Sequence, residues 1–199
     1  CVDSFALDHA LQLAFSCLSP SDVIKKIMIP VLNGLGNGWS QGKVGIAAEH
    51  LASNTFVQKI KNLIGASQAS SGLQPGSPKA LCACFPGEDH TLGLVNVAYI
   101  LASQGFQIVF LGSNLPFSDL GHAISQTKPT SVWLSVTDPA LYQRYLLDLI
   151  LLAKKYQPLP FVLGGQALTY DNPALQNAGC MQCLQPCELP EDLMALPFV

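Results

Sequence analysis

From Lys79 onward, short apolar runs alternate with segments in which apolar residues recur every three or four positions. This alternation is typical of βαβ units, in which helices with right-handed crossovers join parallel strands and cover the sheet. We therefore predict an α/β fold with a doubly wound parallel sheet of the flavodoxin or Rossmann type. The predicted strands are 79–84, 106–111, 130–136, 159–163 and 180–184, and the predicted helices are 91–104, 117–127, 139–156, 166–177 and 190–196.

The residues before Lys79 have a different character. Apolar residues at helical spacing predict three helices, and Pro30 should kink the second helix or mark where it restarts. The segment that follows is rich in Gly, Ser, Gln and Pro and has no apolar period, as is typical of linkers. The predicted organisation is a helical bundle over 1–65 with helices at 3–18, 23–35 and 44–64, a linker over 66–78, and a sheet domain over 79–199.

Composition argues against several classes of protein. Of the 199 residues, 49% are apolar and 12% are charged, so the chain can bury a core and is not intrinsically disordered. A net charge of -3 provides no basic surface, and we expect no direct nucleic-acid binding by this segment. No apolar run approaches the ~20 residues that span a bilayer, and seven cysteines, an odd number, fit reduced thiols in the cytoplasm. The chain starts at Cys1 without a methionine, so we expect a fragment of a longer protein.

A short stretch with acidic residues and a histidine follows the first predicted strand. It runs from Glu88 to Gly93, with the sequence EDHTLG, and leads into a predicted helix. Loops at the carboxyl ends of strands are where open α/β sheets bind ligands. Neutral imidazole is a common metal ligand, and its second ring nitrogen needs an acidic or carbonyl partner to orient it. His90 is therefore a candidate metal ligand, with Glu88 or Asp89 as the orienting partner.

Two further motifs lie downstream at fixed distances. After Gly93 come 41 residues and then Ser135-Val136-Thr137, and after Thr137 come 26 residues and then Gly164-Gly165. This pattern resembles the cobalamin-binding signature: an acidic residue, x, His, x, x, Gly, about 41 residues, Ser-x-Leu, roughly 26 to 28 residues, and Gly-Gly. One element departs from the signature, because Thr137 stands where the leucine is expected.

The resemblance implies a role for each position. His90 would be the lower axial ligand of cobalt and would displace the dimethylbenzimidazole of the cofactor's nucleotide tail, while Glu88, with Asp89 as its rival, would orient the imidazole. The hydroxyls of Ser135 and Thr137 would bind the displaced base, beside a close backbone approach that only glycine allows. The alternative is a flavodoxin-like domain that carries the motif by chance. The residues assigned to the cofactor, including one on the rim after the second strand, are Glu88, Asp89, His90, Thr91, Leu92, Gly93, Leu115, Ser135, Val136, Thr137, Gly164 and Gly165.

The N-terminal segment carries a second resemblance. Nine residues separate Trp39 from Glu49-His50, which resembles the W-x9-EH motif of CarH-type regulators. Those regulators are light sensors that hold adenosylcobalamin between a helical bundle and a cobalamin-binding domain. The resemblance implies that Trp39 covers the adenosyl group and that Glu49 and His50 line its pocket. In the family, a histidine after the tryptophan commonly takes the vacated upper cobalt site after light; Ser40 stands there, and a hydroxyl is a poor replacement.

Together the two resemblances imply a cobalamin-binding sensory module rather than an enzyme. Light would break the cobalt–carbon bond of adenosylcobalamin, shift the bundle against the sheet domain and change the state of a homo-oligomer, and so regulate transcription. The family reaches DNA through a MerR-type helix-turn-helix domain, which is not visible in this chain. Two alternatives stay open: a corrinoid methyl carrier of a methyltransferase system, and a light-insensitive cobalamin sensor or store.

Overall fold

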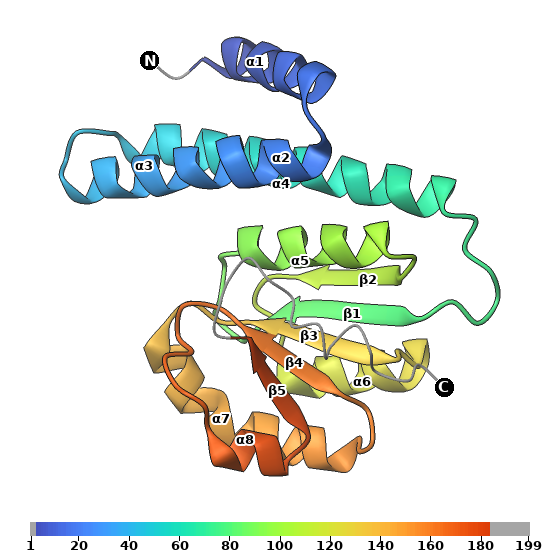
Figure 1. Cartoon of the computed structure of the whole chain (residues 1–199). Helices are drawn as coiled ribbons and strands as arrows, with labels where there is room; N and C mark the ends of the chain where they lie inside the picture. The colour runs from blue at the N-terminus through green and yellow to red at the C-terminus, as the bar shows by residue number, and fades with distance from the viewer. Residues whose placement is uncertain (1–2, 184–199) are drawn as a thin grey trace. The chain divides into compact units, whose positions relative to one another are not determined.

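The computed structural model describes residues 3–183 (Figure 1). The chain divides into two compact units, Cys1–Leu63 and Ile64–Val199. The described part of the first unit is helical, and the second unit contains the sheet.

The second unit is built on five parallel strands in the order β2-β1-β3-β4-β5. Because β1 lies between β2 and β3, the chain winds outward in both directions from the centre, which is the arrangement of a doubly wound sheet. The predicted fold class is confirmed, and each predicted strand lies within two residues of its expected bounds. The strands are β1 (Lys79–Cys84), β2 (Gln107–Gly112), β3 (Ser131–Ser135), β4 (Phe161–Gly164) and β5 (Cys180–Cys183).

A helix follows each of the first four strands: α5 (Leu92–Ser103), α6 (Phe117–Thr127), α7 (Pro139–Lys155) and α8 (Pro173–Asn177). Figure 1 shows α5 on one side of the sheet and the other three on the opposite side. Right-handed crossovers produce this distribution when the direction of winding reverses at β1. Both faces of the sheet therefore carry helices.

Helix α8 is shorter than the predicted range 166–177. The Asn172 side chain accepts a hydrogen bond from the Ala174 amide at 3.0 Å, and Pro173 occupies the first turn, so the helix begins there. The earlier start was wrong because the apolar residues that suggested it are buried in the core as part of a loop. The predicted helix 190–196 lies outside the described residues.

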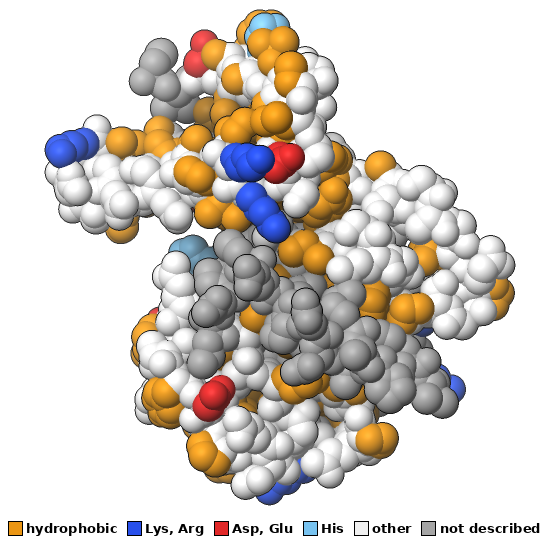
Figure 2. Space-filling model, in the orientation of Figure 1, with side chains coloured by type: hydrophobic (Ala, Val, Ile, Leu, Met, Phe, Trp, Pro, Cys, Tyr) orange, Lys and Arg blue, Asp and Glu red, His pale blue; other side chains and the backbone are white. Residues whose placement is uncertain are grey.

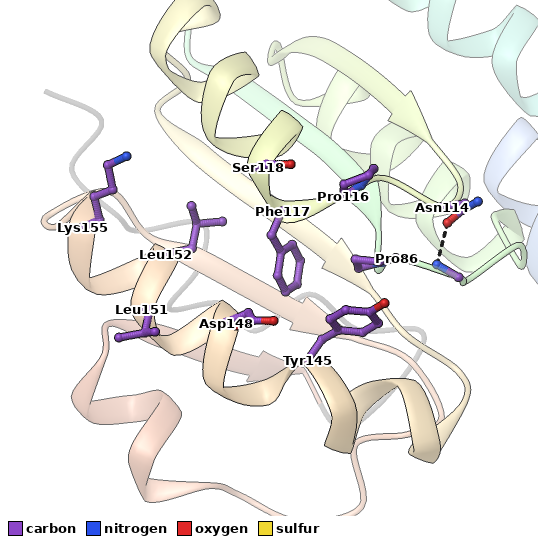
Figure 3. Close-up of a pocket in the computed structure, with 11 residues that line it drawn as sticks. Pro86, Asn114, Pro116, Phe117, Ser118, Tyr145, Asp148, Leu151, Leu152 and Lys155 are labelled. Atoms are coloured by element: carbon purple, nitrogen blue, oxygen red, sulfur yellow. Dashed lines mark hydrogen bonds between the residues drawn. The ribbon is translucent and has the colours of Figure 1, made fainter.

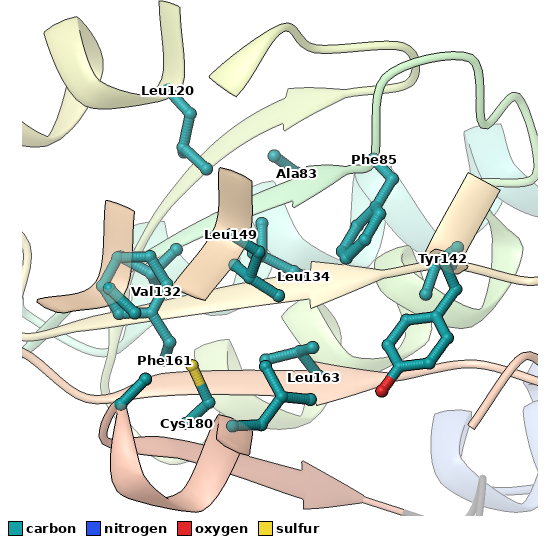
Figure 4. Packing of buried hydrophobic residues seen from close by; sticks show 14 of the residues in the cluster. Ala83, Phe85, Leu120, Val132, Leu134, Tyr142, Leu149, Phe161, Leu163 and Cys180 are labelled. Atoms are coloured by element: carbon teal, nitrogen blue, oxygen red, sulfur yellow. The ribbon is translucent and has the colours of Figure 1, made fainter. Parts of the chain in front are cut away.

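A hydrophobic core lies between the sheet and helices α6, α7 and α8 (Figure 4). Val132 and Leu134 of β3 belong to it, together with Leu149 of α7, which is fully buried. Side chains alternate between the two faces of a strand. Trp133 and Ser135 therefore face the other side of the sheet, the side that carries α5.

The N-terminal unit is a series of helices: α1 (Ser4–Cys17), α2 (Pro20–Val23), η1 (Ile24–Met28), α3 (Ile29–Ser40) and the beginning of α4 (Ile46–Ser70). The segment η1 is a π-helical turn that ends at Met28, two residues before Pro30. Proline has no N–H to donate and disturbs the preceding turn. We predicted a kink or a restart of the helix at Pro30. The structure has a π-helical turn, η1, before this proline instead, and α2, η1 and α3 follow one another without a break.

Helix α4 continues past its predicted end at 64 and covers the start of the predicted linker, 66–78. The residues from 65 to 70 are compatible with a helix. The stronger breakers come later, at Gly72, where φ is 58°, and at Pro75. The helix therefore ends at Ser70, close to these breakers.

Apolar side chains are exposed on the N-terminal unit, as the orange surface in Figure 2 shows. The exposed fraction is 81% for Phe5, 55% for Leu13 and 53% for Trp39. Exposed apolar side chains of this size are available to a ligand or partner. Within residues 3–183 no helix has the length and apolar character needed to cross a membrane.

Candidate functional site

The His90 loop, residues 85–91, joins β1 to α5 at the carboxyl edge of the sheet. The loop after β2 holds its backbone: the Gly87 amide donates to the Asn114 side-chain oxygen at 2.6 Å, and the Asn114 amide donates to the Glu88 carbonyl at 2.9 Å. Gly87 and Asn114 have positive φ values of 80° and 51°, which glycine and asparagine tolerate best. Asn114 was not among the predicted site residues, although its turn sequence, Gly-Ser-Asn-Leu-Pro, favours such a conformation.

Glu88 is the centre of the hydrogen-bond network in this loop. It is 1% exposed, and its Oε1 accepts from the His90 backbone amide at 2.9 Å and lies 2.7 Å from His90 Nδ1. Its Oε2 accepts from the Thr137 amide at 2.6 Å and hydroxyl at 2.7 Å, and from the Asp138 amide at 3.3 Å. One carboxylate thus ties the His90 loop to the end of β3.

The same hydrogen bonds determine the protonation of Glu88. Burial alone would raise the pKa of its carboxyl, but the hydrogen bonds from His90 and Thr137 outweigh burial and lower that pKa to about 2. At neutral pH Glu88 is an acceptor only, so the proton between it and His90 belongs to Nδ1. The His90 side chain is 81% exposed, and in the neutral imidazole the lone pair is on Nε2. This tautomer can bind a metal through Nε2.

Asp89 was the alternative partner for the imidazole. It is exposed, and no hydrogen bond joins it to His90 among the residues that the structure describes. The structure therefore identifies Glu88 as the group that orients His90.

Three residues at the ends of neighbouring strands form a row beside this loop. Cys84, Ser135 and Gly164, called here the edge row, are in register across β1, β3 and β4 and face the α5 side of the sheet. An added Cβ at Gly164 would meet no heavy atom of residues 3–183 within 4 Å. Within the described chain the Ser135 hydroxyl has no hydrogen-bond partner. The edge row thus combines open space with an unused hydroxyl.

Gly165 is required by the protein backbone itself. Its φ is 122°, and an added Cβ would overlap the Val136 carbonyl oxygen. That carbonyl accepts a hydrogen bond from the Ala167 amide at 3.3 Å, which holds the backbone in place. The Val136 side chain belongs to the core on the other face of the sheet, so Val136 contributes only its backbone here.

The Thr137 hydroxyl takes part in the His90 network. We expected this hydroxyl, like that of Ser135, to reach the base of a nucleotide tail. In the structure the hydroxyl donates to Glu88 Oε2 at 2.7 Å and lies 3.3 Å from His90 Nδ1. The residue that departs from the sequence signature therefore completes the His90 network.

The remaining predicted residues of this unit lie close to His90 along the chain or on the neighbouring loop. Thr91 precedes α5, and Leu92 and Gly93 form its first turn. An added Cβ at Gly93 would meet no heavy atom of the described residues within 4 Å, so packing among these residues does not require glycine there. Leu115 is half-buried in the loop after β2.

The other three predicted residues belong to the N-terminal unit. Trp39 lies in the last turn of α3, and Glu49 and His50 lie in the first turns of α4. The His50 Nε2 and Glu49 Oε2 atoms are 3.6 Å apart. Their position above a corrin remains a prediction.

A separate groove of ≈ 700 Å³ lies between α6 and α7 (Figure 3). Its lining includes Phe117 and Tyr145, whose rings meet edge to face at 6.1 Å. It reaches Gly87 in the His90 loop, but neither His90 nor the edge row lines it. This groove is therefore distinct from the predicted cofactor site.

Two models of a known protein family match this chain. A family model described as a B12 binding domain matches residues 78–186, and a second model with the same description matches residues 2–64. The first match covers more than half of the chain. The chain therefore belongs to the B12-binding domain family.

The predicted resemblance to CarH-type proteins is also confirmed. The chain is 29% identical to the HTH-type transcriptional repressor CarH of Myxococcus xanthus over 133 residues, which are 67% of this chain and 43% of that protein. It is 27% identical to the HTH-type transcriptional repressor CarA of the same organism over 169 residues, which are 85% of this chain and 54% of that protein. The chain thus spans about half the length of these relatives.

Two solved structures share the fold. The monomethylamine corrinoid protein of Methanosarcina barkeri has a TM-score of 0.69 at 17% identity, with 93% of this chain and 88% of that chain covered. The methanol:cobalamin methyltransferase complex MtaBC of the same organism has a TM-score of 0.51 at 17% identity, with 98% and 74% covered. At this identity the likeness concerns the fold alone.

Proposed function

We propose that this chain is a sensory module that binds adenosylcobalamin, with His90 as the lower axial ligand of cobalt, and that it responds to light. The observation that carries the proposal is the Glu88–His90 pair, in which a buried carboxylate 2.7 Å from Nδ1 leaves Nε2 free and exposed. The named relatives are transcriptional repressors, which supports a regulatory role rather than an enzymatic one.

The residues of the site fit a corrinoid. Among the residues described, no group of three or more His, Cys, Asp or Glu could hold a metal ion, whereas His90 offers the single nitrogen that an ion already held by a macrocycle needs. The open space at Gly164 and the unused Ser135 hydroxyl suit a displaced nucleotide tail. When bound, the cofactor would supply a cobalt ion with two axial positions and a light-sensitive cobalt–carbon bond.

Each member of the His90 network helps to prepare the ligand. Glu88 keeps the proton on Nδ1 and makes Nε2 more basic. Thr137 donates to the other carboxylate oxygen and so fixes the orientation of Glu88. Because the pKa of Glu88 is about 2, its carboxylate stays ionised and remains a hydrogen-bond acceptor over the whole physiological pH range.

We further propose that the helical segment, residues 1–65, caps the upper face of the corrin and that 66–78 connects it to the cofactor domain. Trp39 has an exposed indole that could cover the adenosyl group. Ser40 donates its hydroxyl to the Asn37 carbonyl at 2.9 Å, so it is engaged within its own helix. The upper position would then pass to His50 or to water after light.

The proposal includes the output of the module. A change of packing or of homo-oligomeric state would regulate transcription, with DNA bound by another domain or a partner and the protein in the cytoplasm. The alternative is a corrinoid methyl carrier, which the fold shared with the monomethylamine corrinoid protein favours. Tighter binding of methylcobalamin than of adenosylcobalamin would support the carrier.

Visible spectra of the chain reconstituted with adenosylcobalamin, recorded in the dark and after green light, test the proposal together with size-exclusion chromatography. We expect a bound cofactor whose spectrum and oligomer size both change on illumination. A spectral change without a change in size would favour the carrier or a passive binder, and no binding would refute the proposal.

His90→Ala tests the ligand itself. We expect weaker cobalamin binding and a spectrum without histidine coordination, because no second imidazole in the loop can replace it. Unchanged affinity together with an unchanged spectrum would remove His90 as the lower ligand.

A further inference from the structure

The face of the sheet that carries the edge row continues inward with a second row of residues. Cys82, Trp133 and Val162 are in register across β1, β3 and β4, two positions before the edge row on each strand. Their exposed fractions are 0%, 4% and 2%. The edge row presents small groups, whereas the second row contains an indole.

A hydrogen bond fixes the Trp133 ring. Its Nε1 donates to the Ser131 hydroxyl at 2.9 Å, and Ser131 lies two residues further from the carboxyl edge on the same face of β3. The indole therefore extends along the strand from Trp133 toward Ser131, away from the edge. Trp133 is the next residue inward of Ser135 on this face, so its side chain forms the inner boundary of the space beside Ser135.

The position of the Trp133 ring matters because the nucleotide tail of cobalamin ends in a large base. Residues on one face of a strand follow each other at about 6.6 Å, so little depth is left between Ser135 and the indole. Dimethylbenzimidazole is a fused two-ring base, as is indole. A base that reaches Ser135 cannot pass further inward on this face unless the Trp133 ring leaves its place.

We propose that Trp133 limits the depth of the tail site and makes this chain select corrinoids by the size of their lower base. This inference rests on the proposed function, in which the edge row receives the tail. The benzimidazole of cobalamin stays at the level of Ser135, near the edge of the sheet. Corrinoids with no lower base bind at least as tightly as cobalamin, because they have no ring to accommodate.

The test is the ratio of two dissociation constants, for adenosylcobalamin and for adenosylcobinamide, which lacks the nucleotide and its base. Both are measured in the dark from the visible spectrum of the bound corrinoid. The wild-type chain should bind adenosylcobinamide at least as tightly as adenosylcobalamin. Trp133→Ala should shift the ratio toward adenosylcobalamin by about tenfold or more, because the removed ring opens the inner part of the site.

Two further variants separate this effect from a loosened fold. Leu134→Ala makes a cavity at the neighbouring residue on the opposite face and should leave the ratio unchanged. Trp133→Phe removes one ring, retains more of the packing, and should shift the ratio in the same direction by a smaller factor. It decides the question if Trp133→Ala does not fold.

Two results would overturn the inference while leaving the proposed function standing. One is a wild-type chain that binds adenosylcobalamin tenfold more tightly than adenosylcobinamide. The other is a ratio that neither Trp133 variant changes. Failure of the wild-type chain to bind either corrinoid would overturn the proposed function, and this inference with it.

Discussion

Thr137→Val removes one hydroxyl from the Glu88 network while it preserves the shape of the side chain. The backbone amide of residue 137 still donates to Glu88 Oε2, but the hydroxyl bond of 2.7 Å is lost. A hydrogen bond to a charged group contributes about 1.5–3 kcal/mol, and one pH unit of pKa corresponds to about 1.4 kcal/mol. We therefore expect the pKa of Glu88 to rise from about 2 toward its ordinary value of 4.5.

This change should destabilise the sheet unit at neutral pH. The native pKa of Glu88 is below the ordinary value of 4.5, so its ionised form stabilises the native state above pH 4.5, and this contribution is lost as the pH falls from 4.5 to about 2. Thr137→Val should lower the free energy of unfolding by about 2 kcal/mol at pH 7. The difference between the two proteins should shrink on acidification below pH 4, as Glu88 becomes protonated in both.

Urea unfolding followed by tryptophan fluorescence measures this difference. The chain has two tryptophans, so a Trp39→Phe background leaves Trp133 of β3 as the reporter of the sheet unit. Thr137→Ser keeps a hydroxyl and should unfold within about 0.5 kcal/mol of its parent. The reasoning is refuted if Thr137→Val is as stable as its parent at pH 7, or if its deficit persists undiminished at low pH.

Three other substitutions probe the cofactor site. Trp39→Ala should raise the Kd for adenosylcobalamin about tenfold more than that for hydroxocobalamin, and equal losses would mean that Trp39 does not face the adenosyl group. Gly164→Leu should weaken cobalamin binding by about tenfold or more without changing urea unfolding of the free protein, since its side chain enters open space; undiminished binding would place the tail elsewhere. Gly165→Ala should instead lower the unfolding free energy of the free protein by about 3 kcal/mol, because its Cβ would overlap the Val136 carbonyl, and wild-type stability would show that this backbone adjusts.

The strands could be predicted because parallel strands are buried on both faces and therefore leave continuous apolar runs in the sequence. The start of α8 could not, because apolar residues of a buried loop and of a helix look alike over so short a range. The end of α4 was also missed, since Gly, Ser and Gln from 65 to 70 suggest a linker but do not prevent a helix. Local composition predicts elements better than it predicts their bounds.

For the candidate site, too, one part could be predicted from the sequence and another part could not. The spacing of the motifs predicted that His90, Ser135 and Gly164 would lie at the same edge, because strand ends in a parallel sheet come together. The sequence favoured Glu88 as the partner of His90 but left Asp89 as its rival, and the contacts that decide between them could not be predicted. The choice depends on how the loop is turned, and the loop is held by contacts with a segment distant in sequence.

The negative charge of Glu88 acts on the Cys84 thiol as well as on His90. Burial raises the pKa of that thiol, as do the negative charges of Glu88 and Asp89, and together they bring it to about 12. Only the thiolate form of cysteine binds metals strongly or attacks electrophiles. The Cys84 sulfur lies 3.7 Å from the His90 carbonyl oxygen. This thiol therefore stays protonated at neutral pH and is a poor metal ligand and a poor nucleophile. The carboxylate that prepares the imidazole thus keeps the adjacent sulfur protonated, and a soft metal that reaches this edge meets nitrogen rather than sulfur.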